Sequence, residues 1–355
     1  MKKTLIAVSV ALAAYANANA DEELKPSAWV PLPAIGSSPE TGFQYGAYVM
    51  RIFPQLESGV PQNRLELLLQ GTTQGQFQAY FWPNVYVDQG NWQVKGKLGG
   101  KYWPSAYFGQ GNTSNENGDK YADTTAETSI TLNYRGVPAF SFGGSMFAEY
   151  HQLKDISEEP GTTLLTPDIS GAQGGLYSGI GINASHDTRD NIDWPTQGHL
   201  LTANWDVFTA VLGSELDFHV ASLSVANYLA VAEDVLGVSA SLAMSSEETP
   251  FTHLPKPTGD RTLRGANGNR WIDNSSLGLQ GEYRKVLSQR WAVVGFVDTF
   301  QVAPTLADFS VSDFHVSTGL GVRFAMTPDR FNVRLDVGWV DAESFNMAIT
   351  VGEAF

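Results

Sequence analysis

Histidine and acidic residues that could bind a metal or take part in hydrolysis are grouped at one place in the sequence. His186 and Asp187 are adjacent, and Asp190 follows shortly after. Such a group could supply metal ligands or two members of a hydrolase triad. The segment continues through Asn191 to Gly198, however, and Asp, Asn and Gly at the end of a strand are typical of a turn. We therefore expect a turn here and no catalytic site.

A second polar segment has the oxygen ligands that calcium prefers. Residues 115–119 read Asn-Glu-Asn-Gly-Asp, but they lack the twelve-residue pattern of a calcium-binding loop. The sequence also contains no Gly-x-Ser-x-Gly elbow and no phosphate-binding loop. We expect no enzymatic activity, no cofactor and no metal site.

The C-terminal end of the chain alternates between apolar and polar residues. Apolar side chains fall on one face of a strand at Phe345, Met347, Ile349, Val351 and Phe355. Small or polar residues occupy the other face, and Glu353 is the single charge on the apolar face. Alternation over roughly ten residues is typical of a transmembrane barrel strand, with lipid outside and water inside. The alternative is an amphipathic strand in a soluble β-sandwich.

Similar alternating segments recur along the chain. They cover residues 43–53, 64–72, 76–87, 91–101, 124–135, 139–151, 176–187, 199–209, 215–231, 235–248, 277–286, 291–301, 316–326 and 331–339. With 345–355 and a first segment at 28–36 they give sixteen strands, and bacterial single-chain barrels favour even numbers. Because every backbone polar group must be paired in lipid, these strands must close into a barrel. We predict an all-β fold, a sixteen-stranded antiparallel transmembrane β-barrel with its longest connections on the outer side.

The N-terminus has the features of a secretory signal peptide. Two lysines precede an apolar stretch at residues 5–15, and residues 18–20 form an Ala-x-Ala cleavage site. We predict a signal peptide over residues 1–20 and one barrel domain over residues 21–355, with no separate periplasmic domain before the first strand. The predicted location is the bacterial outer membrane.

Composition is consistent with this interpretation. The chain has no cysteine, so its fold does not depend on disulfide bonds. Its 35 glycines and 12% aromatic residues suit an all-β protein with many turns. A formal net charge of -15 argues against nucleic acid as a partner. Outer-membrane lipid is the partner that the alternating strands predict.

The predicted sixth outer loop, residues 249–276, carries a motif of known type. It contains Leu263, Arg264 and Gly265 within the run Thr-Leu-Arg-Gly-Ala-Asn-Gly. Its length and its Arg-Gly core resemble the characteristic loop of the BamA/TamA superfamily of outer-membrane assembly and translocation barrels. In that family the loop arginine enters the lumen and meets acidic residues of the following strands. Shorter matches to the family lie earlier in the chain, at residues 38–42, 107–112 and 185–198, and their order is that of the family.

The resemblance implies roles for individual residues. Arg264 would hold the loop inside the lumen, and the matching acids are Glu282 and Asp298. Ala266 stands where the family has an aromatic residue, and Trp271 is a candidate to replace its apolar anchoring. The best-known members also carry N-terminal POTRA domains that receive client polypeptides. This sequence shows none, so it resembles a barrel-only branch.

Physical chemistry supports part of this arrangement. A guanidinium is planar and always charged, and its fork of donors suits carboxylates. Glu282 shares a strand face with polar neighbours and is expected to face the lumen. Asp298 shares its face with apolar side chains, so its direction stays open. The alternative is that Arg264 lies in a solvated loop and both acids line a wet pore.

The first and last strands are expected to meet at a weak seam. Pro31 and Pro33 are two positions apart, so their missing N–H groups point to the same side of strand 28–36. That side would face the terminal strand, which ends at Phe355. In BamA-like barrels lateral opening is thought to occur at this junction. The alternative is that residues 28–36 never join the sheet.

The function that the resemblance implies is transport or assembly. The barrel would aid insertion or passage of a polypeptide or lipid, with a periplasmic or membrane protein as partner. The alternative is a passive outer-membrane pore whose lumen is constricted by the sixth loop.

Overall fold

The computed structural model describes residues 24–355, except 39, 59, 116, 158–164 and 328–329. The predicted signal peptide, residues 1–20, therefore lies outside the described residues. The helices of the described residues are three short 3₁₀ turns, and none of them could cross a bilayer.

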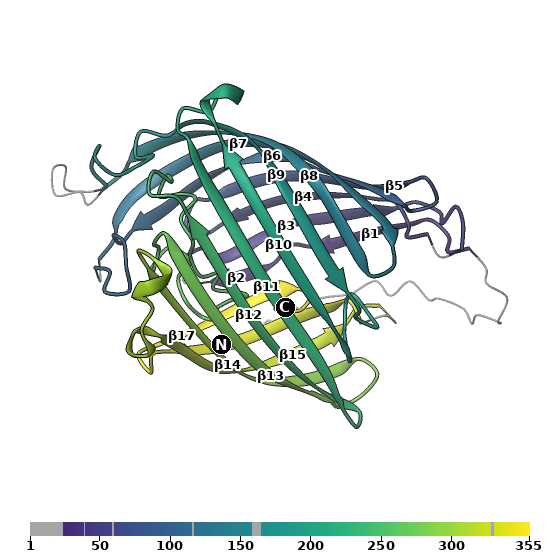
Figure 1. Cartoon of the computed structure of the whole chain (residues 1–355). Helices are drawn as coiled ribbons and strands as arrows, with labels where there is room; N and C mark the ends of the chain where they lie inside the picture. The colour runs from purple at the N-terminus through teal and green to yellow at the C-terminus, as the bar shows by residue number, and fades with distance from the viewer. Residues whose placement is uncertain (1–23, 39, 59, 116, 158–164, 328–329) are drawn as a thin grey trace, which may run out of the picture.

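Strands of one antiparallel sheet make up most of the structure (Figure 1). Their bounds are β1 Ala28–Pro33, β2 Gly36–Ser38, β3 Gly42–Ile52, β4 Arg64–Thr72, β5 Phe77–Val87, β6 Trp92–Tyr107, β7 Asp119–Val137, β8 Phe140–Asp155, β9 Gly175–Asp187, β10 Gly198–Phe208, β11 Phe218–Val231, β12 Asp234–Ser245, β13 Ser275–Val286, β14 Trp291–Ala303, β15 His315–Ala325, β16 Asn332–Val340 and β17 Ser344–Val351.

Neighbours in the sheet are neighbours in the sequence from β3 to β17. Each of these strands pairs antiparallel with the next, including β9 with β10. β17 is followed in the sheet by β2, which pairs with β3, so the order of neighbours returns to its start. Figure 1 shows the sheet curving round in this way. Antiparallel neighbours joined by short connections are the arrangement that the repeated alternating segments predict.

The predicted first strand, residues 28–36, is divided in two, so the described residues form a sheet of seventeen strands rather than sixteen. Both pieces pair with β3 in one register, because Pro33 lies opposite Ala47 and Gly36 lies opposite Gln44. Pro33, the last residue of β1, has no N–H, and its position in the ladder faces away from β3. The segment does join the sheet, but as two short strands instead of the single strand that the sequence predicted.

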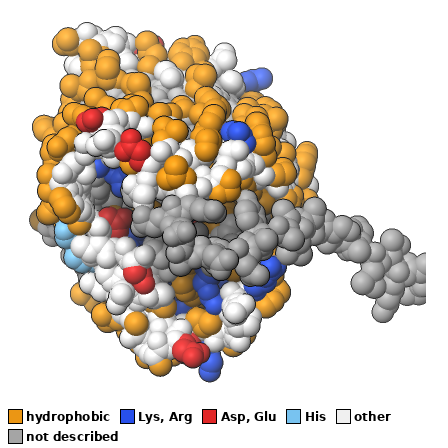
Figure 2. Space-filling view, turned by 90° about the vertical axis from the view of Figure 1, so that its right-hand side faces the viewer, with side chains coloured by type: hydrophobic (Ala, Val, Ile, Leu, Met, Phe, Trp, Pro, Cys, Tyr) orange, Lys and Arg blue, Asp and Glu red, His pale blue; other side chains and the backbone are white. Residues whose placement is uncertain are grey.

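Side chains on the strands are buried in the opposite sense to those of a soluble protein. In β15 the apolar Val316, Leu320 and Val322 are exposed, at 38%, 72% and 38%, whereas Ser317 and Arg323 are 0% exposed. An apolar outer face and a polar inner face are what a barrel surrounded by lipid requires. Figure 2 shows hydrophobic side chains spread over the outside of the molecule on one side.

Two strands extend beyond the predicted segments. β6 ends at Tyr107 and β7 begins at Asp119, so their connection covers residues 108–118 instead of the predicted 102–123. The added part of β7 opens with Asp119 and Lys120, and it lacks the apolar alternation that identified the other strands. Backbone pairing can continue where the side chains no longer alternate, so the hydrophobic pattern underestimates the length of such strands.

Candidate functional site

The connection between β12 and β13, residues 246–274, lies against the concave face of the sheet, and we call it the inner loop. It buries several side chains, including those of Phe251, Leu254, Leu263 and Arg264. Its turn at Gly265 requires glycine: φ is +94°, and an added Cβ would lie 3.0 Å from the Gly338 oxygen of β16. The loop backbone therefore fits closely against β16.

Arg264 donates hydrogen bonds to two carboxylates at once. Its Nε and Nη2 donate to Asp298 at 2.8 and 2.7 Å, and its Nη1 donates to Glu282 at 2.7 Å. Its backbone N–H also donates to Asp298, at 3.0 Å. The guanidinium carbon lies 3.6 Å from the centre of the Phe296 ring. Arg264, Glu282 and Asp298 are 1%, 2% and 0% exposed. The structure thus brings the predicted three residues together, including Asp298, whose direction strand parity left open.

The inner loop also contacts the strands at the C-terminal end of the sheet. The Ser317 hydroxyl on β15 donates to the Arg264 oxygen. Asn346 on β17 donates from Nδ2 to the Gly265 oxygen at 2.8 Å. The short segment around Arg264 is therefore bonded to β13, β14, β15 and β17.

Apolar packing accompanies these polar contacts. Leu263 is 0% exposed and lies in one buried cluster with Ala266, Trp271, Phe300 and Val340. Trp271, the candidate to replace the aromatic residue missing at position 266, belongs to the same cluster as Ala266 itself. Its ring also stacks on His315, with centroids 3.7 Å apart.

A second group of buried charges continues from the Arg264 group. Arg323 donates to Asp336 at 2.6 Å and to Glu353 at 2.9 Å, and Arg334 donates to Asp336 at 3.0 Å. Arg284 lies two residues after Glu282 on β13 and donates a hydrogen bond to it. We call the eight residues the inner charge cluster: Arg264, Arg284, Arg323, Arg334, Glu282, Asp298, Asp336 and Glu353. Its four arginines balance its four acids, as burial of charge demands.

The C-terminal tail turns inward and does not continue the last strand. β17 ends at Val351 rather than Phe355, and Gly352 has a φ of +75°. Glu353 then reaches the inner charge cluster, which accounts for the one charge on the predicted apolar face. Phe355 lies against Tyr228, with ring centroids 6.1 Å apart, rather than facing lipid. The sequence predicted a strand to the last residue because alternation does not reveal a turn at glycine.

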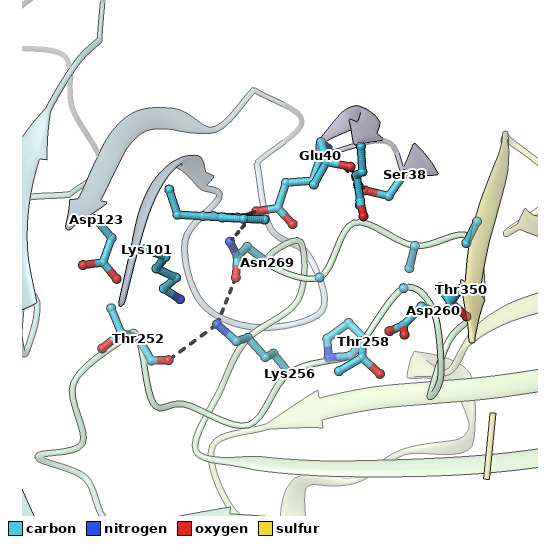
Figure 3. A pocket seen from close by; sticks show the side chains of 18 of the residues that line it. Ser38, Glu40, Lys101, Asp123, Thr252, Lys256, Thr258, Asp260, Asn269 and Thr350 are labelled. Carbon is cyan, nitrogen blue, oxygen red and sulfur yellow. Dashed lines mark hydrogen bonds between the residues drawn. The ribbon is translucent and has the colours of Figure 1, made fainter. Parts of the chain in front are cut away.

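A cavity of about 600 Å³ lies beside the inner loop (Figure 3). Ser38 of β2 and Thr350 of β17 line one side of it, and Lys101 of β6 lines another. Lys256 and Asn269 of the inner loop project into it and are joined by a hydrogen bond of 3.0 Å. Burial lowers the pKa of Lys256 to about 8. The cavity is polar and borders the junction of the first and last strands.

Comparisons with known proteins identify the family of this chain. The Omp85 superfamily domain matches residues 63–355. The chain belongs to the Omp85 superfamily. The match confirms the resemblance to BamA/TamA-like barrels that was inferred from the motif in the inner loop. No curated protein matches the sequence.

Solved structures of Omp85-like barrels have the same fold. BamA from Haemophilus ducreyi lacking POTRA domains 1-3 is 13% identical at a TM-score of 0.63, over 92% of this chain and 70% of that one. CdiB from Acinetobacter baumannii is 10% identical at a TM-score of 0.58, over 93% and 60%. CdiB from Escherichia coli is 11% identical at a TM-score of 0.61, over 93% and 67%. This Omp85 chain therefore spans 60–70% of the length of these structures.

The junction between the first and last strands of the Omp85 barrel differs in detail from the seam that the sequence predicted. Ala34 donates its N–H to the Gly46 oxygen of β3 at 3.0 Å, so the alternate positions Pro31 and Pro33 face away from β3. The strand that follows β17 in the sheet is β2 rather than β1. The prolines therefore lie before the three-residue strand that meets β17. The sequence did not show this, because it could not show where residues 28–36 divide.

Sequence reasoning missed most of the inner charge cluster. Arg323, Arg334 and Asp336 stand on the polar faces of alternating segments, so strand parity could have placed them inside. Glu353 could not be placed, because its position depends on the turn at Gly352.

The other candidates from the sequence are accounted for as turns. Asp187 bonds Arg189 at 2.8 Å, and Asp190 accepts from the Thr196 N–H at 2.9 Å. Such contacts are those of a structured turn, as predicted. Segment 115–119, which has calcium-type ligands but was not expected to bind a metal, contains residue 116, which lies outside the described residues.

Proposed function

We propose that this Omp85 barrel resides in the bacterial outer membrane after signal-peptide-dependent export. There it would aid insertion or passage of a polypeptide or lipid, together with a periplasmic or membrane protein partner and in contact with outer-membrane lipid. The proposed role is not enzymatic. The observation that carries the proposal is the attachment of the inner loop, through Arg264 and Gly265, to both the barrel wall and the terminal strand β17.

The geometry of the strand junction supports this role. β17 pairs with β16 through eight residue pairs, whereas its neighbour on the other side, β2, is three residues long. An interface between short strands has fewer hydrogen bonds and opens at lower cost. The polar cavity borders β2 and β17, so a segment crossing the junction would pass from this cavity toward lipid. A loop bonded to β17 is placed to couple the cavity to the junction.

A passive pore is the second candidate. The polar cavity beside the inner loop favours it, because a water-filled path needs polar walls. A pore would need no opening of the wall. The two functions therefore differ in whether the β2–β17 junction must separate.

Disulfide locking of the junction tests the proposal. The chain has no native cysteine, so pairs of cysteines can be introduced at residues 36–38 and 347–351 without background. A locked pair should fail to restore the outer-membrane protein and lipid composition of a deletion strain, and reduction should restore it. A matched pair across β4 and β5, at Leu69 and Ala79, is the control. Full function of the locked barrel, with a large steady current in planar bilayers, would favour the pore.

Fractionation tests the proposed location. The protein should sediment with outer membranes and show heat-modifiable mobility on gels, as folded barrels do. A soluble periplasmic species that elutes as a compact monomer without detergent would contradict the location and the barrel together.

A further inference from the structure

Two histidines and a glutamate from distant parts of the chain converge on the cavity beside the inner loop. Glu149 and His151 belong to β8, and His253 belongs to the inner loop. The His151 Nε2 lies 3.4 Å from one Glu149 oxygen, and the His253 Nε2 lies 3.4 Å from the other. The three ligand atoms are within 4.8 Å of one another. We propose that these residues bind a divalent transition-metal ion of the Zn²⁺ type.

The outer nitrogen of each ring is already occupied. The His151 Nδ1 is 3.0 Å from Asp123, and the His253 Nδ1 is 3.0 Å from the Thr252 hydroxyl. A carboxylate only accepts hydrogen bonds, so the Nδ1 of His151 carries a proton toward Asp123, and its Nε2 is the nitrogen directed at Glu149. A carboxylate behind a metal-binding histidine fixes the ring and its tautomer. Asp123 and Thr252 are both labelled at the edge of the cavity in Figure 3.

The spacing of the atoms suits a shared ion better than direct hydrogen bonds. Charge-assisted N–H···O bonds are about 2.7–2.9 Å long, shorter than the 3.4 Å seen on both sides of Glu149. Ligands held about 2.0–2.2 Å from a tetrahedral Zn²⁺ are about 3.3 Å apart. Each of the two nitrogen-to-oxygen distances is close to this edge, and each involves a different Glu149 oxygen. Small rotations of the two rings would complete the geometry.

Aromatic rings and a further acid surround the site. His253 packs among aromatic rings, with centroids 5.4 Å from Tyr177, 5.3 Å from Phe208 and 5.2 Å from Phe218. A divalent cation would offset the charges of Glu149 and the nearby Asp123.

Other charged groups share the cavity with the site. Lys97 also lines it, but it is paired with Glu127. Lys101 and Lys256 line it too, with Glu40 as a further acid. Three protein ligands leave a fourth position for water or a ligand from the cavity. Such an ion would fasten the inner loop to β8, on a part of the wall that Arg264 does not reach.

Zinc titration of the purified full chain in detergent tests the proposal. After treatment with a chelator, the protein should bind one equivalent of Zn²⁺ and retain it on desalting. Glu149→Gln, which keeps the size of the side chain, and His253→Ala should each weaken binding by about 100-fold or more. Asp123→Asn should weaken it by about 10–100-fold. Heat-modifiable mobility checks that each variant is folded.

Two controls make the outcome decisive. His219 is exposed on β11, so His219→Ala should leave the affinity unchanged. His186 and His199 lie 2.8 Å apart at another place, so His186→Ala should also leave it unchanged. Co²⁺ should give the visible absorption of a four-coordinate site in the wild type but not in His253→Ala. Equal Zn²⁺ binding by wild type and His253→Ala, or its loss in His186→Ala, would overturn the assignment. So would a wild type that binds no Zn²⁺, which would leave the cluster as contacts between histidines and carboxylates alone.

Discussion

Single charged residues stabilise the inner loop because each is buried with its partners. Arg264 donates hydrogen bonds to both Glu282 and Asp298, so its loss would leave two carboxylates without their shared cation. Removing one member of a buried charge pair is costly, whereas an exposed pair contributes little. The buried arginines therefore have much larger expected effects than surface arginines.

Arg264→Ala tests this at one residue. We expect the free energy of unfolding in detergent to fall by about 3–5 kcal/mol and protease cleavage within residues 246–274 to increase. Arg290→Ala is the control, because Arg290 is exposed. Unchanged unfolding and cleavage in Arg264→Ala would show that the arginine does not hold the loop.

Lys256 makes the stability of the inner loop dependent on pH. Burial lowers its pKa from 10.5 to about 8 in the folded chain. Below about pH 8 the amine is charged in both states, so folding bears the full cost of burying the charge. Between about pH 8 and 10.5 the unfolded chain binds more protons, so stability rises with pH.

A substitution isolates this effect from other titrations. The unfolding free energy of wild type relative to Lys256→Met should rise between about pH 7 and pH 10. A parallel pH dependence of wild type and Lys256→Met would refute the assignment.

At the scale of elements, the C-terminal tail depends on one glycine. Gly352 has a φ of +75°, and an added Cβ would meet no atom within 4 Å. Gly352→Ala should therefore act only through backbone strain, with a cost of about 1–2 kcal/mol. Fluorescence-detected denaturation measures this cost.

The same chain offers a matched control for the tail. Gly281 in β13 also has open space around its Cβ position, but its φ is not positive. Gly281→Ala should have little effect on unfolding. Equal effects of the two substitutions would mean that the turn at Gly352 does not direct Glu353 and Phe355 inward.

At the scale of the whole molecule, the exposed apolar outer face should be in contact with lipid. Leu320 on β15 is 72% exposed, and Val311 in the connection before β15 is 91% exposed. Arginine on the lipid face of a barrel costs about 2–4 kcal/mol near the bilayer centre and little near its edges. Leu320→Arg should therefore destabilise refolding into lipid vesicles, and Val311→Arg should not. Similar refolding of both variants would place the wall outside the membrane.

Sequence alone was sufficient to find the repeated strands, though not all their bounds, because side-chain alternation is a local property of consecutive residues. The predicted first residues of β15 and β16 are each within one residue of those in the structure. Strand parity also placed the Glu282 side chain on the inner face. Arg264 and its acids were reached through a recognisable motif as well as through charge chemistry.

Tertiary structure decided the features that depend on distant segments. The sequence did not show that Gly352 turns Glu353 toward Arg323, because alternation carries no information about a turn after the last strand. Nor did it show that the inner loop carries His253 to Glu149 on β8. A strand pattern depends on neighbours in the chain, whereas a cluster of buried charges depends on which strands and loops face one another across the barrel.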